Sequence, residues 1–347
     1  MQLRAITIDD YTSPRAGEQK WGQVLKCLPP ILSVNAYKNA LKQAWTDDHR
    51  VAVVAVPESI GPRANLGRAG AETSLAAWLP ALANLQVNAA SNPAPLLVVG
   101  AVECDDLQAQ AEPLDLSHSN QLEQLRELVA ELDARVIAVL QPLFELGFDV
   151  VLIGGGHNNA YPLLKSLASA SESVVGAMNL DPHSDFRACE GRHSGNGFRY
   201  AYSEGFLQHY HVVGLHPAKN NADSLNAMHD AGFDYTHIDI ARTKAWDTLT
   251  LHWQQRAAAW QVPFGIEVDL DAVTGMPASA MNYVGVEANQ VVQYIAGLAQ
   301  LPQARYLHLT EAAPCLHPAG LEAGNRMVGQ IITEGLLAYL NARAAQS

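Results

Sequence analysis

The sequence predicts an α/β fold built around a parallel β-sheet. Short runs rich in Val, Ile and Leu recur along the 347 residues, and helical patterns separate them. Strands that are buried on both faces of a sheet read as continuous apolar runs, and helices between them connect one parallel strand to the next. No Ser/Gly-rich linker interrupts the pattern. We therefore expect one domain over 1–347, with 1–49 as an N-terminal extension packed on it.

Eight apolar runs are predicted to be strands, and they cover 51–57, 96–102, 148–154, 174–180, 210–215, 235–240, 264–273 and 305–310. The clearest helix is predicted over 120–147, where leucine and valine recur at intervals of three or four residues. Asn120 and Glu123 are predicted to form a capping box at its start. The alternation fits both an open sheet and a (β/α)₈ barrel. In either architecture the ligand site lies at the carboxyl ends of the strands.

Composition and charge limit the class of partner. The chain is 48% hydrophobic and 16% charged, which is typical of a folded globular enzyme. Its formal net charge of -13 disfavours nucleic acid and anionic membrane surfaces as partners and favours metal ions or small cations. There is no apolar signal core at the start and no uninterrupted apolar segment of about 18 residues. A cytoplasmic location is therefore expected.

Acidic and imidazole side chains follow four of the predicted strands. They are His157, the trio Asp181, His183 and Asp185, the pair Asp269 and Asp271, and Glu311. Taken singly, each Asp is an ordinary helix cap and His157 an ordinary turn residue. Four neighbouring aspartates cannot all stay ionised without cations, however, and carboxylate and imidazole ligands without thiolate suit manganese, magnesium or zinc. Together these residues predict a metal site.

Three of these segments resemble the metal motifs of the ureohydrolase superfamily, which comprises arginases, agmatinases and formimidoylglutamases. They are "GGGHNN" (154–159), "DPHSD" (181–185) and "EVDLDAV" (267–273), in matching order and spacing over roughly 50–345. The resemblance implies a three-layer α/β/α sandwich with an eight-stranded parallel sheet. It therefore favours the open sheet over the barrel.

The same resemblance implies two Mn²⁺ ions per chain. One would be held by His157, Asp181, Asp185 and Asp269, and the other by Asp181, His183, Asp269 and Asp271. Two such ions, about 3.5–4 Å apart, lower the pKa of a shared water and direct the resulting hydroxide at an amidine or guanidine carbon. Asp185 would orient the hydroxide. Glu311 would pair with the cationic nitrogens of the substrate.

Residues downstream of the metal motifs bear on the substrate. The segment "SGN", Ser194 to Asn196, resembles the part of arginases that holds the substrate's α-carboxylate, although these are also common turn residues. Arginases carry a proton-transferring histidine two residues after that asparagine, whereas this chain has Phe198. Arginase activity is therefore disfavoured, and formimidoylglutamases are the closer resemblance.

A second segment supports the same branch. Residues 56–72, "VPESIGPRANLGRAGAE", resemble a loop of formimidoylglutamase-like proteins. In one reading Arg63, Asn65 and Arg68 contact the carboxylates of the substrate. In the other reading the two arginines only tie the loop to the rest of the domain through ion pairs.

The function expected from the sequence is hydrolysis of a C–N bond in a small linear amidine. N-formimidoyl-L-glutamate plus water would give L-glutamate and formamide, a reaction of histidine metabolism. The alternatives are an arginase or another guanidino-acid hydrolase that releases urea, and a non-catalytic relative with a structural or regulatory role. Family resemblance also implies a homo-oligomer.

Overall fold

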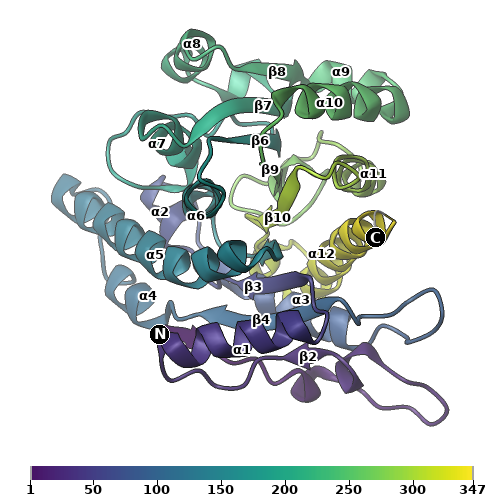
Figure 1. The fold of residues 1–347 in the computed structure, drawn as a ribbon. Helices are drawn as coiled ribbons and strands as arrows, with labels where there is room; N and C mark the ends of the chain where they lie inside the picture. The colour runs from purple at the N-terminus through teal and green to yellow at the C-terminus, as the bar shows by residue number, and fades with distance from the viewer. Residues whose placement is uncertain (1, 346–347) are drawn as a thin grey trace.

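The central sheet of the computed structural model, which describes residues 2–345, contains ten strands in the order β1-β4-β3-β5-β10-β9-β6-β7-β8, with β2 paired to β4 (Figure 1). The strands are β1 (Leu3–Arg4), β2 (Lys26–Cys27), β3 (Val51–Ala55), β4 (Leu96–Val102), β5 (Asp149–Ile153), β6 (Val175–Leu180), β7 (Leu207–Leu215), β8 (Asp234–His237), β9 (Phe264–Asp269) and β10 (Ala304–Thr310). The eight strands from β4 to β8 all run parallel, and β1 pairs antiparallel with β4.

The eight predicted strands are confirmed, and the open sheet excludes the barrel. The sheet exceeds the predicted eight strands because β1 and β2, each of two residues, pair with the outer edge of β4. Two predicted strands end three or four residues earlier than expected. After β8 the chain enters a helix at Ile238, and after Asp269 it turns into a short 3₁₀ helix, because the Asp269 side chain accepts the backbone N–H of Asp271 at 2.8 Å.

Helices cover both faces of the sheet, as Figure 1 shows for α5 and α6 on one side and α11 and α12 on the other. One layer contains α1 (Val34–Thr46), α2 (Ile60–Ala64), α4 (Asp105–Ala111), α5 (Ser119–Leu146), α6 (Ala160–Ser171), α7 (Gly197–Ser203) and α8 (Ala222–Asp230). The other contains α3 (Ser74–Ala83), α9 (Ile238–Thr243), α10 (Trp246–Trp260), α11 (Ala288–Leu298) and α12 (Leu321–Ala344). The three-layer sandwich is confirmed.

Alternation along the strands supplies a separate hydrophobic core to each face. In β3, Val51, Val53 and Ala55 belong to the core under α3 and α12, whereas Ala52 and Val54 belong to the core under α5 and α6. Successive side chains of a strand point to opposite faces, so a run buried on both sides must be apolar at every position. This is why β3 reads as an unbroken apolar segment.

The long helix α5 agrees with the predicted periodicity. Leu125, Val129, Leu132 and Val136 are all buried against the sheet. The predicted capping box is wrong, because the helix begins at Ser119 and its N-cap is His118, whose side chain makes no capping hydrogen bond. Asn120 and Glu123 therefore both lie inside the helix, where Asn120 cannot act as the N-cap.

The segment before β3 lies against the edge of the sheet and the α5 layer. Tyr37 of α1 is buried and donates its hydroxyl to the carbonyl oxygen of Val139 in α5 at 2.9 Å. The assignment of 1–347 to one domain stays a prediction. Among the helices of residues 2–345, none has the length and apolar character needed to cross a bilayer.

Candidate metal centre

The predicted site residues lie at the carboxyl ends of four strands that are neighbours in the sheet, β5, β10, β9 and β6. His157 begins the short helix η4 (His157–Asn159) after β5, and Glu311 follows β10 directly. Asp269 is the last residue of β9, and Asp181 follows β6. Parallel strands end at the same edge of a sheet, so side chains distant in sequence converge there.

The turn after β5 depends on its glycines. Gly154 and Gly155 have φ angles of 85° and 70°, in the region that side-chain-bearing residues avoid. A Cβ on Gly155 would also lie 2.8 Å from the carbonyl oxygen of Val56. Buried Glu58 then fixes the next residue, because its Oε1 accepts the backbone N–H of Gly156 at 2.7 Å. The "GGGH" segment thus turns the chain so that His157 faces the strand ends.

Two site carboxylates occupy unusual backbone positions. Asp185 has φ 44° and Glu311 has φ 65°, both in the left-handed region. Non-glycine residues rarely adopt this conformation, and such strain concentrates at functional sites. The Glu311 side chain is held in place, since its Oε1 accepts the backbone N–H of His157 at 2.9 Å.

The six predicted metal ligands fall into two groups that share Asp181. In the first, His157 Nδ1 lies 2.9 Å from Asp185 Oδ2 and 3.4 Å from Oδ2 of both Asp181 and Asp269. In the second, His183 Nδ1 lies 3.3 Å from Asp181 Oδ1 and 3.2 Å from Asp271 Oδ2. The two oxygens of Asp181 thus face different groups.

The electrostatics of the centre reflect an excess of negative charge. Burial raises the pKa of Asp269 well above its usual value, and the charges of Asp271 and Asp181 raise it further. Burial also favours the neutral form of Asp181, but interactions with His157 and His183 lower its pKa to about 2. Burial raises the pKa of Glu311 to about 8, opposed by the His157 N–H and assisted by the charges of Asp185 and Asp271.

These residues fit divalent cations. His157 Nδ1 and Asp271 Oδ1 are buried without a hydrogen bond, and unpaired buried polar atoms are costly. A cation in the first group would satisfy His157 Nδ1, a cation in the second group would satisfy Asp271, and both would offset the negative charge of the carboxylates. Oxygen and imidazole donors suit manganese, magnesium or zinc.

A cavity of about 480 Å³ opens onto the centre. Its lining includes four of the six predicted metal ligands, His183, Asp185, Asp269 and Asp271, together with Glu311. The same cavity is lined by the exposed cationic residues Arg187 and Lys219. A small molecule bound there would meet both the metal centre and two positive charges.

The sequence model of the arginase family matches residues 49–337. This chain belongs to the arginase family. Its curated relatives include the formimidoylglutamase of Macrococcus caseolyticus, 26% identical over 183 residues that make up 52% of this chain and 58% of that protein. The chain thus spans little more than half the length of that relative. The formimidoylglutamase of Aromatoleum aromaticum is 25% identical over 91% of this chain and 86% of its own.

Solved structures show the same arginase-family fold. The formiminoglutamase of Trypanosoma cruzi, solved with Mn²⁺, superposes with a TM-score of 0.65 at 19% identity and covers 87% of this chain and 97% of its own. The sequence interpretation of the family and of the α/β sandwich is therefore confirmed.

Within this arginase-family site, the predicted substrate-binding residues separate into two sets. Asn65 and Ser194 both line the cavity, and Asn65 Nδ2 lies 3.4 Å from Ser194 Oγ. Asn196 is fully buried behind them, where its Oδ1 accepts Arg192 Nη1 at 2.7 Å and the His193 N–H at 3.1 Å. Asn196 therefore holds the loop in place from the inside and does not line the cavity.

The structure does not bring Arg63 and Arg68 to the cavity. The Arg68 guanidinium donates to the carbonyl oxygens of Ala278 and Ser279 at 2.7–3.0 Å, which ties its loop to a distant segment. Arg63 lines a different hollow, together with Glu72 and Asp105. Arg68 therefore anchors its loop, as in the second reading, but it does so through backbone carbonyl oxygens and not through the expected ion pairs.

Phe198 also lies outside the cavity lining. Its ring is fully buried, stacks on Tyr210 with centroids 4.4 Å apart, and meets the His157 ring edge-on at 5.2 Å. It packs against the metal centre from within the protein.

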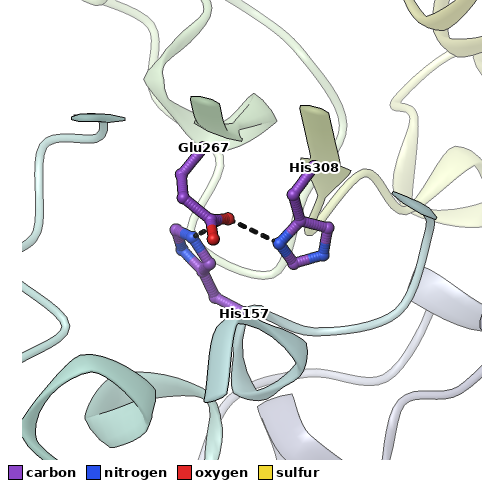
Figure 2. A group of neighbouring side chains, drawn as sticks. All are labelled: His157, Glu267 and His308. Atoms are coloured by element: carbon purple, nitrogen blue, oxygen red, sulfur yellow. Dashed lines mark hydrogen bonds and ion pairs between the residues drawn. The ribbon is translucent and has the colours of Figure 1, made fainter. Parts of the chain in front are cut away.

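Four residues that lie at the candidate site were not predicted from the sequence. Arg187 and Lys219 follow β6 and β7 and line the cavity, and their position after strands was an available signal. Glu267 and His308 lie inside β9 and β10, beside His157 (Figure 2). Ionisable residues inside apolar, fully buried strands were the signal for this pair.

Proposed function

We propose that this chain is a binuclear manganese hydrolase that cleaves N-formimidoyl-L-glutamate with water to L-glutamate and formamide. The observation that carries the proposal is one cavity with an acidic metal centre and two cationic side chains. In the part of the chain that the structure describes, neither Arg187 nor Lys219 makes an ion pair. Positive groups without acidic partners at a cavity favour a ligand that brings its own carboxylates.

The charge distribution of this substrate is complementary to the cavity. N-formimidoyl-L-glutamate carries a cationic amidine and two carboxylates. Glu311 would pair with the amidine nitrogens, and Arg187 and Lys219 would pair with the carboxylates. Asn65 and Ser194 would supply neutral hydrogen bonds beside Arg187. The names of the formimidoylglutamase relatives support the same assignment.

The proposed ligand sets follow the two observed groups. His157, Asp181, Asp185 and Asp269 would hold one Mn²⁺, and Asp181, His183 and Asp271 would hold the other, with Asp269 bridging as the resemblance implies. When bound, the ions act as Lewis acids that lower the pKa of water and stabilise developing negative charge. The Mn²⁺ in the Trypanosoma cruzi protein supports the choice of metal.

The remaining roles belong to side chains of this chain. Asp185 would orient the attacking water through its carboxylate, because it lies both in the cavity lining and against His157. Glu311 would fix the amidine, with its own position set by the His157 N–H. The proposal also includes a cytoplasmic homo-oligomer that acts in histidine breakdown.

The test is product analysis with a panel of substrates. The purified, Mn²⁺-loaded protein is given formimidoylglutamate, arginine, agmatine and guanidinobutyrate in parallel, and formamide, glutamate, urea and bound metal are measured. Formamide and glutamate from the first substrate alone support the proposal. Urea from a guanidino compound would replace the substrate and keep the reaction class. No product from any of the four, with two metals bound, would contradict the proposed activity.

A further inference from the structure

Glu267 is a charged side chain in the middle of a fully buried strand. Its exposed fraction is 0%, as is that of His308, its register partner on the adjacent strand β10. Figure 2 shows the Glu267 carboxylate next to both His157 and His308, with a dashed line to each ring. Glu267 Oε2 lies 3.3 Å from His157 Nε2 and 2.6 Å from His308 Nδ1. An ionised carboxylate is rarely placed in a core without a specific role for its charge.

The geometry argues against a separate metal ion held by these three residues. Metal bonds to oxygen and nitrogen of about 2.0–2.2 Å in tetrahedral geometry separate two ligand atoms by about 3.4 Å. The 2.6 Å between Glu267 Oε2 and His308 Nδ1 is instead the length of a strong hydrogen bond. Tyr306 donates its hydroxyl to the other oxygen, Oε1, also at 2.6 Å. The carboxylate is therefore held by its neighbours on β10.

Neighbouring rings restrict the orientation of the His157 imidazole. Phe198 meets it edge-on at 5.2 Å and His308 at 5.6 Å between centroids. Its Nδ1 faces the carboxylates of the metal centre, and its Nε2 faces Glu267. A histidine binds a metal through an unprotonated nitrogen, so the proton of a ligating His157 must be on Nε2.

We propose that Glu267 is a positioning residue that accepts the Nε2 proton of His157 and thereby directs the lone pair of Nδ1 at a metal ion. His308 and Tyr306 fix Glu267 for this task. The inference rests on the proposed function in one respect, the assignment of His157 as a ligand. Partners of metal-bound histidines of this kind set the tautomer and ring orientation.

The proposal makes a prediction that distinguishes the two metal groups. His157 belongs to the group of Asp181, Asp185 and Asp269, whereas the other group is Asp181, His183 and Asp271. Loss of Glu267 should therefore weaken one Mn²⁺ and spare the other. A general loss of packing would weaken both.

The experiment is a Mn²⁺ titration of the metal-free full-length protein by calorimetry, with thermal unfolding measured on the same samples. Glu267→Met removes the acceptor and its charge at similar volume, and should lower the affinity of one of two equivalents by about 10- to 100-fold. Glu267→Gln keeps an acceptor and should lose less. Asp149→Asn is the matched control, because this buried carboxylate on β5 pairs with Arg305 and Arg343 outside the metal groups.

Unchanged affinity at both equivalents in the folded Glu267 variants, or equal weakening of both, would overturn the inference while leaving the proposed function in place. Failure of the unsubstituted protein to bind two Mn²⁺ would overturn the metal assignment and the inference with it. Should Glu267→Met not fold, Tyr306→Phe removes one of the groups that hold Glu267 and should weaken the same single equivalent to a smaller extent. Unchanged binding in Tyr306→Phe and Glu267→Gln together would also overturn the inference.

Discussion

Glu311 Oε1 accepts the backbone N–H of His157 at 2.9 Å, although the two residues are 154 positions apart in the chain. The hydrogen bond joins the loop after β10 to the loop after β5. It places a carboxylate of the cavity beside the first metal-ligand group without using a ligand atom of that group. Under the proposed function, metal binding would depend on the imidazole of His157 and substrate binding on the carboxylate of Glu311.

Replacement of the Glu311 carboxylate should lower turnover and leave the metal content unchanged. Glu311→Gln keeps an acceptor for the His157 N–H but removes the carboxyl group, whose pKa, raised to about 8 by burial, would fall when bound cations and a cationic amidine favour its charged form. We expect both metals to stay bound and kcat/KM for formimidoylglutamate to fall at least about 30-fold, the effect of losing one partner of a buried charge pair worth about 2 kcal/mol. Steady-state kinetics and metal analysis on one preparation check this. Retention of full activity would remove Glu311 from the proposed roles.

The shared carboxylate of Asp181 gives a prediction of stoichiometry. Its Oδ2 faces His157 and its Oδ1 faces His183, so Asp181→Ala should empty both metal positions. His183→Ala removes a ligand from the second group alone and should leave one Mn²⁺ per chain. Metal content after gel filtration, with circular dichroism to verify folding, measures both. Two Mn²⁺ in the Asp181 variant would rule out its bridging role.

Arg187 should act on substrate binding more than on the chemical step. Arg187→Met removes a cation that lines the cavity, and we expect KM for formimidoylglutamate to rise about 10- to 100-fold with kcat changed much less. Arg63→Met is the matched control, because Arg63 lines a separate hollow. Its KM should stay within about 2-fold of the unsubstituted value. Equal effects of the two substitutions would contradict the assignment of Arg187.

His211, which belongs to neither metal-ligand group, should make the free energy of unfolding depend on pH. Burial, assisted by the charge of Arg256 and opposed by that of Asp234, lowers the pKa of this β7 residue to about 3. The folded state keeps His211 neutral while the unfolded state takes up a proton below pH 6.5. Its contribution is therefore present above that pH and is lost as the pH falls.

Between pH 7 and pH 5 this protonation should cost about 2 kcal/mol of unfolding free energy. Urea denaturation at the two pH values, compared between the unsubstituted protein and His211→Asn, isolates the contribution. The variant should lose about 2 kcal/mol less across this interval. An identical pH dependence in both proteins would show that His211 does not carry it.

Much of the fold and the acidic centre could be predicted from the sequence, because both rest on local patterns. Strands such as β3 are buried on two faces and so are apolar at every position. The ligands follow such strands directly, so the end of the apolar run marks their place. The predicted capping box of α5 was wrong because the spacing of Asn120 and Glu123 does not determine which residue begins the helix.

The parts that could not be predicted depend on contacts between distant segments. Arg68 looks like a ligand-binding arginine in its own loop, but its partners Ala278 and Ser279 come about 210 residues later. The role proposed for Glu267 can be inferred only when the pairing of β9 with β10, which brings His308 beside it, is known. Asn196 is turned inward by Arg192, only four residues earlier, but Arg192 is itself held by Asp133 of α5, which is 59 residues away.

The left-handed backbone at Asp185 and Glu311 has an evolutionary consequence. Glycine adopts these angles without the roughly 1–2 kcal/mol that a side chain costs there. At Glu311 the hydrogen bond from the His157 N–H offsets part of this cost, whereas the contact of Asp185 is with the imidazole of a proposed metal ligand. A lineage released from selection for the proposed activity should therefore lose Asp185 to glycine or asparagine before it loses the apolar strands, and Glu311 should persist longer because its hydrogen bond also serves the fold.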